Sequence, residues 1–159
     1  MESGFVLPDL ASEDSAPFWA GCGRGELLVQ ACARCGRWRF PPRPMCPSCR
    51  SLEFTWTPTS GRGRVWSFVV AHPPLLPAYA ALAPYNVVVV ALDEDPTIRM
   101  VGNLVEGADG PINAVAPGTI EIGEPVQVVF APVEDVTLPR WVRAAGSSGP
   151  GPGGEGRVR

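Results

Sequence analysis

Four cysteines constrain the fold of this 159-residue chain more than any other feature of its sequence. They form two Cys-x2-Cys pairs separated by ten residues: Cys32, Cys35, Cys46 and Cys49. Each pair can sit on a tight turn whose backbone N–H groups point at the sulfurs. Two such turns supply four thiolates to one tetrahedral Zn²⁺. The spacing therefore predicts a zinc ribbon over residues 31–55.

We interpret this zinc as structural. A catalytic zinc usually has three protein ligands and an open position for water, whereas four cysteines close the coordination shell. The alternative is a redox-active Cys-x-x-Cys, but that motif normally lies at a helix N-terminus within a βαβ pattern, which this sequence lacks. The remaining cysteine, Cys22, is interpreted as a partly buried free thiol.

The segments around the cysteines predict a mostly β chain of five parts. Residues 1–14 are expected to be a flexible lead-in, and residues 15–30 an N-terminal helix with Ser15 as its cap and Pro17 in its first turn. The zinc ribbon follows. Residues 56–144 are expected to form a five-stranded OB-fold barrel, and residues 145–159 a disordered tail rich in Gly, Pro and Ser.

The barrel is predicted from five segments rich in β-branched and aromatic residues, separated by turns containing Gly, Pro or Asp. These segments are 63–72, 85–92, 98–106, 126–133 and 138–144. The run Val87–Val90 indicates a strand buried on both faces. Trp66 and Phe68 alternate along the first segment, so both are expected in the barrel core.

The positive charge is concentrated around the ribbon. All 13 basic residues are arginines, and eight of them lie between Arg24 and Arg64, a segment of formal charge +6 against −9 for the rest. A Zn²⁺ with four thiolates would add −2 and leave the segment positive. Arginines can clamp a partner's carboxylates or phosphate groups. They can also bind nucleic acid, but the sequence pI of about 5.1 argues against that partner for the chain as a whole.

The hairpin between the cysteine pairs carries the candidate contact residues. They are Arg37, Trp38, Arg39, Phe40 and Arg43. Alternating arginine and aromatic side chains at this position are expected to be exposed and to form a contact surface.

We find no catalytic constellation in the sequence. The single histidine, His72, precedes two prolines at the end of a predicted strand, with no nucleophile motif nearby. The acidic triplet at residues 93–95 reads as a hairpin tip, and the Gly-rich stretch at 60–65 lacks the pattern of a phosphate-binding loop. The sequence contains no apolar run long enough to span a membrane and no signal-peptide pattern, so we expect a cytoplasmic protein.

The order of these motifs resembles the DUF35 family. The resemblance rests on "PFWAG", "LLVQACARCGRWRFPPRPMCPSCRS", "SGRGRVWSFVV", "PYNVVVVALDE", "RMVGNLVEG" and "IEIGEPVQVVF", and covers roughly residues 15–134. It implies a rubredoxin-like zinc ribbon followed by an OB-fold, with the four paired cysteines as zinc ligands.

The resemblance also implies a non-catalytic accessory subunit of a thiolase-superfamily enzyme. In such a hetero-oligomer the partner holds the acyl-CoA and does the chemistry. A similar domain is the partner of a thiolase-like aldolase in actinobacterial steroid side-chain degradation, where it can be fused behind a MaoC-like hydratase fold. This chain is then either a stand-alone relative or an excised domain. Two alternatives stay open: a nucleic-acid-binding module, and a stand-alone acyl-CoA-binding or hydrolytic protein.

Overall fold

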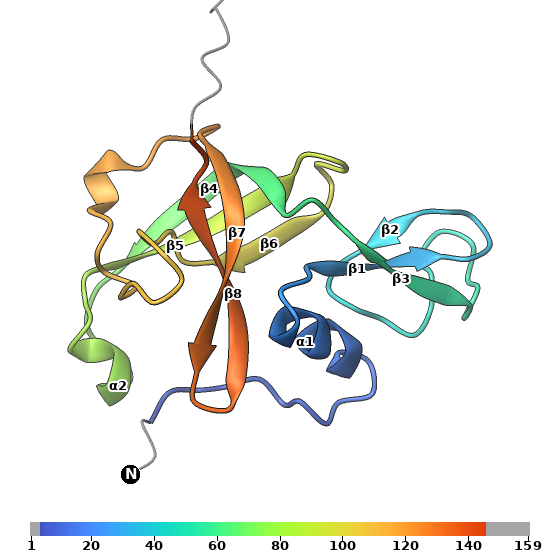
Figure 1. The fold of residues 1–159 in the computed structure, drawn as a ribbon, viewed down its shortest axis with the longest axis horizontal. Coiled ribbons are helices and arrows are strands. Elements are labelled where there is room, and N and C mark those ends of the chain that lie inside the picture. Colours follow the sequence, from blue (N-terminus) through green and yellow to red (C-terminus); the bar gives the residue numbers. More distant parts are fainter. Residues whose placement is uncertain (1–3, 146–159) are drawn as a thin grey trace, which may run out of the picture.

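A computed structural model describes residues 4–145 of the chain. Its elements, in chain order, are α1 (Ala16–Gly23), β1 (Leu28–Cys32), β2 (Trp38–Arg39), β3 (Phe54–Pro58), β4 (Arg62–Ala71), α2 (Pro77–Ala80), β5 (Tyr85–Leu92), β6 (Arg99–Gly102), η1 (Pro117–Thr119), β7 (Pro125–Val133) and β8 (Val136–Arg143). Figure 1 shows two β units with α1 between them. The predicted mostly β class is confirmed.

The smaller unit is an antiparallel three-stranded sheet in the order β2-β1-β3. Its central strand, β1, pairs over its whole length with β3, from Leu28 opposite Pro58 to Cys32 opposite Phe54. The short strand β2 pairs with the other edge of β1, where Gln30 faces Arg39. Cys32 is the last residue of β1, so the group of paired cysteines lies at this end of the sheet.

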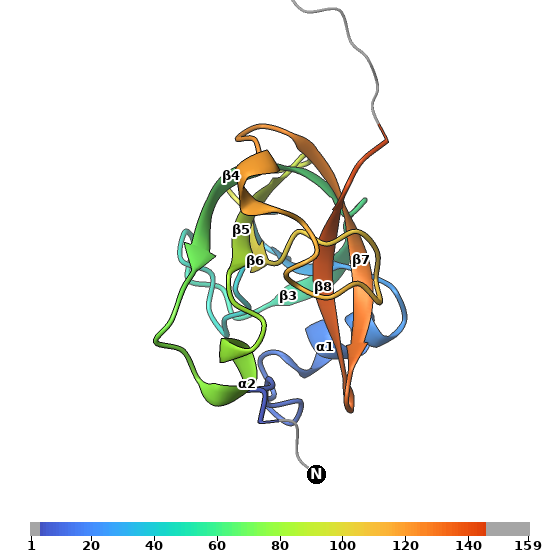
Figure 2. The ribbon, with the colours of Figure 1, turned by 90° about the vertical axis from the view of Figure 1, so that its left-hand side faces the viewer.

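The larger unit is a five-stranded, nearly closed barrel of the OB type, with strand order β6-β5-β4-β7-β8 (Figure 2). The gap between the outer strands is bridged next to β6, where Leu104 pairs in parallel with Trp141 of β8. Trp141 N–H donates to the Asn103 carbonyl at 2.9 Å, and Val105 N–H donates to the Trp141 carbonyl at 2.8 Å. These bonds satisfy backbone groups that an open sheet edge would leave unpaired.

A single hydrophobic core joins the helix, the ribbon sheet and the barrel. Phe18 and Cys22 of α1 and Val29 of β1 belong to the same buried cluster as Val88 and Trp141 of the barrel. Helix α1 packs against both β1 and β8. The ribbon sheet is therefore anchored to the barrel through α1.

The side chain of Asn86 attaches β5 to the segment that closes the barrel. It is fully buried, its Nδ2 donates to the Leu104 carbonyl at 2.9 Å, and its Oδ1 accepts from the Leu104 N–H at 2.7 Å. One amide thus pairs with both polar backbone groups of a buried residue.

We expect Asn86→Ala to lower the free energy of unfolding by about 2–4 kcal/mol, because two buried backbone groups lose their partner. Urea denaturation followed by tryptophan fluorescence measures the change. Asn113→Ala is the matched control, since Asn113 is exposed. An equal effect of both substitutions would contradict the assigned role of Asn86.

The predicted helix is too long at its C-terminal end. Helix α1 ends at Gly23, and Leu28 already belongs to β1. Residues 28–32 form a strand because they pair with residues 54–58, which local sequence does not reveal. Pro17 lies in the first turn as predicted, but the Ser15 side chain makes no capping bond.

Two burial predictions on the barrel are wrong. Strand β5 alternates between buried and half-buried residues, so only one of its faces is fully buried. Trp66 is 50% exposed, because it follows the buried Val65 and alternation along β4 turns it to the outer face. The register of β4 against β5 shifts between Val65 and Ser67, so Phe68 does not share this face and packs against the core. The Trp66 ring lies outside the barrel, with the Arg99 guanidinium carbon 3.7 Å from the ring centroid.

The ends of the chain were predicted to lack fixed packing. Within the predicted lead-in, Phe5 lies edge-on to Tyr79 of α2, with ring centroids 5.0 Å apart. This part of the lead-in therefore packs on α2. The predicted tail lies outside the described residues from residue 146 onward. No helix within residues 4–145 is long and apolar enough to cross a membrane.

Candidate metal centre

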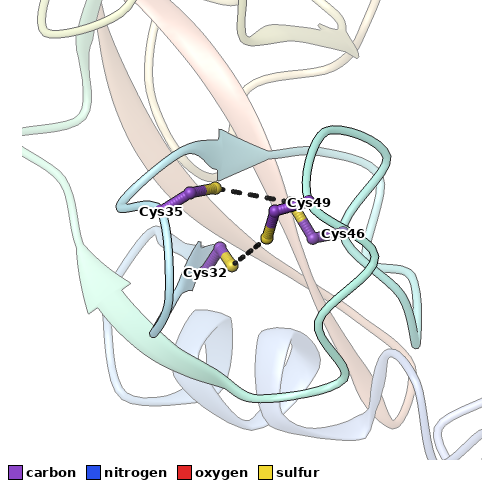
Figure 3. A group of neighbouring side chains, drawn as sticks. All are labelled: Cys32, Cys35, Cys46 and Cys49. Atoms are coloured by element: carbon purple, nitrogen blue, oxygen red, sulfur yellow. Dashed lines mark hydrogen bonds between the residues drawn. The ribbon is translucent and has the colours of Figure 1, made fainter.

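The four paired cysteines converge on one point of the ribbon. Their sulfurs all lie within 4.8 Å of one another. Cys32 Sγ is 3.5 Å from Cys49 Sγ, and Cys35 Sγ is 3.7 Å from Cys46 Sγ (Figure 3). The sequence prediction that these residues form one cluster is thus met by the geometry.

Both cysteine turns have the same backbone geometry. The Gly36 N–H donates to the Cys32 carbonyl at 2.9 Å, and the Arg50 N–H donates to the Cys46 carbonyl at 3.0 Å. The residue four places after the first cysteine has a positive φ in each turn, 71° at Gly36 and 61° at Arg50. Glycine adopts this conformation without strain, whereas arginine rarely does. The two turns therefore repeat one backbone conformation, although only the first has a glycine at the position with positive φ.

The electrostatics of the cluster favour thiolates at two positions. Backbone N–H groups of Cys49 and Ser48 lower the pKa of Cys46 to about 6. The Cys35 N–H is the largest cause of the lowered pKa of Cys32. At Cys49 the Ser51 N–H acts in the same direction, but desolvation and the neighbouring sulfurs raise its pKa to about 11. Four like charges this close cannot all ionise without a compensating cation.

A tetrahedral metal ion fits this cluster. Zinc–sulfur bonds of about 2.3 Å place the sulfurs of a tetrahedral site about 3.8 Å apart. The measured contacts of 3.5 and 3.7 Å are close to this spacing. A disulfide would need about 2.05 Å, and all five cysteines are free. Four protein ligands leave no coordination position for water, so the site is of the structural type.

The fifth cysteine is separate from the cluster. Cys22 is fully buried in α1, and burial raises the pKa of its thiol to about 12. A thiol of this kind is a core side chain and a poor nucleophile. Cys22 is a free thiol as interpreted from the sequence, but it is fully rather than partly buried.

The structure divides the predicted contact residues into two groups. Arg37 and Arg43 are exposed. Trp38 and Phe40 are half-buried and pack against the core, with Phe40 5.3 Å from Phe18 between ring centroids. Arg39 is only 5% exposed, so its predicted place on a contact surface is wrong. Strand alternation turns Arg39 onto the face of the sheet that also carries Gln30.

Other exposed side chains on the ribbon escaped the sequence analysis. Met45 is 49% and Leu52 is 66% exposed, on either side of the second cysteine turn. The sequence did contain a signal for them: each is a large apolar residue close to an arginine and to the second cysteine turn. This combination can indicate an exposed contact surface. His72 is exposed at the end of β4, far in sequence from any of these residues.

An apolar cavity at one end of the barrel was also missed. It has a volume of about 380 Å³ and lies between the N-terminal segment, α2 and the β7–β8 hairpin. Arg140 lines it and donates to the Gly110 carbonyl at 3.0 Å, and burial lowers the pKa of its guanidinium. The residues that line the cavity come from segments far apart in sequence, so no local motif predicts it.

A short helix, a four-cysteine ribbon and a five-stranded barrel with a common core define a zinc-ribbon/OB-fold protein. Two family models match consecutive parts of the chain. Residues 19–55 match "ChsH2, rubredoxin-like zinc ribbon domain", and residues 56–131 match "ChsH2, C-terminal OB-fold domain". The chain belongs to the DUF35/ChsH2 family.

Curated relatives and a solved structure agree with this assignment. The chain is 36% identical to the 3-oxo-4,17-pregnadiene-20-carboxyl-CoA hydratase alpha subunit of Mycobacterium tuberculosis, over 82% of this chain and 38% of that protein. It is 33% identical to a DUF35 domain-containing scaffold protein of Methanothermobacter thermautotrophicus, over 70% and 77% of the two chains. It is 28% identical to the benzoylsuccinyl-CoA thiolase subunit BbsA of Thauera aromatica, over 82% and 78%.

The solved structure is the "Ltp2-ChsH2(DUF35) aldolase". It superposes with a TM-score of 0.73 at 34% identity, covering 87% of this chain and 100% of the matched chain. The chain thus spans less than two fifths of the hydratase subunit but the whole of the DUF35 chain in the aldolase structure.

Proposed function

We propose that this chain is a non-catalytic accessory subunit of a thiolase-superfamily enzyme that acts on acyl-CoA. The reaction we propose is the retro-aldol cleavage of steroid side-chain degradation. The observation that carries the proposal is the match to the full length of the DUF35 chain of an aldolase. Relatives named as subunits of a CoA-ester hydratase and a CoA-ester thiolase support the same class of substrate.

The metal we propose is Zn²⁺, held by the four clustered cysteines in a structural role. Four thiolates with the observed spacing are the ligand set that zinc prefers in ribbon domains. When bound, the ion supplies the positive charge that allows the four sulfurs to remain together as thiolates.

The chemistry is assigned to the partner. His72 is the sole histidine of the chain, is exposed, and lies outside the cysteine cluster. The cluster has no position open for substrate. We therefore expect no turnover of acyl-CoA by the purified chain, and the role of this chain is to stabilise the partner and its CoA site.

The surface we propose for docking is the outer side of the ribbon, here called the ribbon tip. It consists of the exposed residues Arg34, Arg37, Arg43, Met45, Arg50 and Leu52. Exposed apolar side chains surrounded by arginines are typical of the centre of an interface. The arginines can also bind the phosphates of CoA bidentately where the partner holds it.

Reversing two charges of the ribbon tip, Arg37→Glu with Arg43→Glu, is expected to weaken binding to the partner about tenfold or more, because complementary charge guides and holds the complex. Binding is measured by interferometry or calorimetry at two salt concentrations. Arg62→Glu with Arg64→Glu on the barrel, two exposed arginines outside the ribbon tip, is the matched control. Equal effects of the two variants would place the interface elsewhere.

The accessory function itself is tested by affinity purification of the tagged chain from its native lysate at moderate salt. Recovery of a thiolase-like protein in near-stoichiometric amount, with CoA-ester cleavage by the complex and none by the chain alone, is the expected result. Recovery of nuclease-sensitive material, or turnover by the isolated chain, would contradict the proposal.

A further inference from the structure

Arg39 on β2 is a buried cation that lacks a counter-ion among residues 4–145. Its side chain is 5% exposed, and its Nη1 and Nη2 are buried without a hydrogen-bond partner in that part of the chain. Its Nε donates to Gln30 Oε1 at 2.6 Å, which is a neutral acceptor. A buried guanidinium with one neutral acceptor is unusual, because burying a charge requires compensation.

Carboxylates do not provide that compensation. The ion pairs among the described residues are Arg24 with Glu26 and Arg143 with Glu124, and neither involves the ribbon sheet. The Phe54 ring provides part of it, since the Arg39 guanidinium carbon lies 4.9 Å from the ring centroid. A cation over a ring is stabilised only modestly, so most of the charge remains uncompensated.

The strand register places this cation beside the metal centre. Arg39 lies opposite Gln30, and Phe54 lies opposite Cys32. Residues directly opposite each other share a face of a sheet, as do residues two apart along a strand. Arg39, Phe54 and the metal ligand Cys32 therefore share one face, and the guanidinium reaches across β1 to the residue that pairs with Cys32.

We propose that Arg39 is the internal counter-cation of the four-cysteine centre. A divalent ion with four thiolates carries a net charge of −2. A fixed positive charge on the same face stabilises that anion, and therefore strengthens metal binding. Gln30 positions the cation, because its Oε1 accepts from both Arg39 Nε and the backbone N–H of Arg43, the latter at 2.9 Å. Arg39 does not ligate the metal in this proposal; it supports the metal centre through its charge.

The other arginines near the cysteines are unsuited to this role. Arg34, Arg37 and Arg50 are exposed. Charges in water are screened by solvent and salt, so their effect on the centre is small. The same difference in burial supplies a control: Arg37→Met removes an equal charge from the same hairpin.

The test compares the Zn²⁺ dissociation constants of the full chain and three variants, measured by competition with a chromogenic chelator. Arg39→Met keeps an unbranched apolar side chain but removes the charge, and we expect it to bind Zn²⁺ about 10–100-fold more weakly, the usual range for a residue that supports metal ligands. Arg39→Lys keeps the charge and is expected to stay within about threefold of the natural chain. Arg37→Met is expected to stay within about twofold.

Three results would overturn the proposal. Unchanged affinity in Arg39→Met would show that the charge does not act on the metal. Equal losses in Arg39→Met and Arg39→Lys, including failure of both to fold, would show that Arg39 acts through packing. Failure of the natural chain to bind Zn²⁺ would also overturn it. That last result leaves the accessory function open, because affinity purification tests the function separately.

Discussion

Cys46→Ser is expected to abolish stoichiometric zinc binding and to unfold the cysteine turns of the ribbon, while the barrel keeps its structure. Cys46 is fully buried, and its pKa is lowered to about 6 by the backbone N–H groups of Cys49 and Ser48. It is therefore a thiolate prepared for a metal, which serine cannot replace.

The effect is expected to be large because few interactions other than the metal ligands stabilise the cysteine turns. Apparent binding free energies of structural zinc are about 10–16 kcal/mol, and this energy is available for folding. The cysteine turns contribute few apolar side chains to the common core, whereas Trp38 and Trp56 of the ribbon sheet, and Phe40 directly after β2, pack against that core. Loss of one ligand thus removes most of the stabilisation of the two cysteine turns.

Zinc content by atomic emission and limited proteolysis of the ribbon measure the outcome. Cys22→Ala is the matched control, because it removes a buried thiol that is no ligand. It should retain one zinc per chain and lower stability by about 1–2 kcal/mol through a small cavity. Full zinc occupancy in Cys46→Ser would contradict the four-cysteine site.

The second large effect is expected from Trp141→Ala, which should lower the free energy of unfolding by about 3–5 kcal/mol. Trp141 is 1% exposed and lies where the barrel closes, and its backbone bonds to Asn103 and Val105. The space next to it is matched to the ring, since a Cβ on Gly102 would lie 3.0 Å from the indole. Removing the indole leaves a cavity at the closure of the barrel.

Trp141→Phe distinguishes the contribution of the aromatic ring from that of the indole N–H. The indole Nε1 is buried without a partner among residues 4–145, so phenylalanine loses no hydrogen bond. We expect a loss of about 1–2 kcal/mol for phenylalanine, well below that for alanine. Urea denaturation measures both variants. Similar losses in the two would show that the indole does not fill the closure of the barrel.

Since α1 packs against both β8 and β1, Trp141→Ala should also loosen the ribbon. Hydrogen exchange of the β1 amides reports this. Unchanged exchange at β1 would show that packing around Trp141 does not stabilise the ribbon sheet.

The sequence alone determined those parts of the protein that depend on neighbouring residues. The cysteine turns repeat one local hydrogen-bond pattern, so their spacing predicted the cluster. Runs of β-branched residues predicted the barrel strands to within a few residues, except that β6 ends at Gly102. Pro17 predicted the start of α1. In each case the decisive interactions lie within a few positions along the chain.

Only the tertiary structure decided features that depend on pairing across the chain. The end of α1 at Gly23 and the start of β1 follow from pairing with residues 54–58. The barrel sets which face of β4 points inward: Val65 is buried, so its neighbour Trp66 is exposed. Arg39 is buried because it lies opposite Gln30. A one-residue change of register moves a side chain to the other face of a sheet, and residues distant in sequence set the register. For that reason the sequence located the metal centre, whereas the fold showed which arginine lies buried beside it.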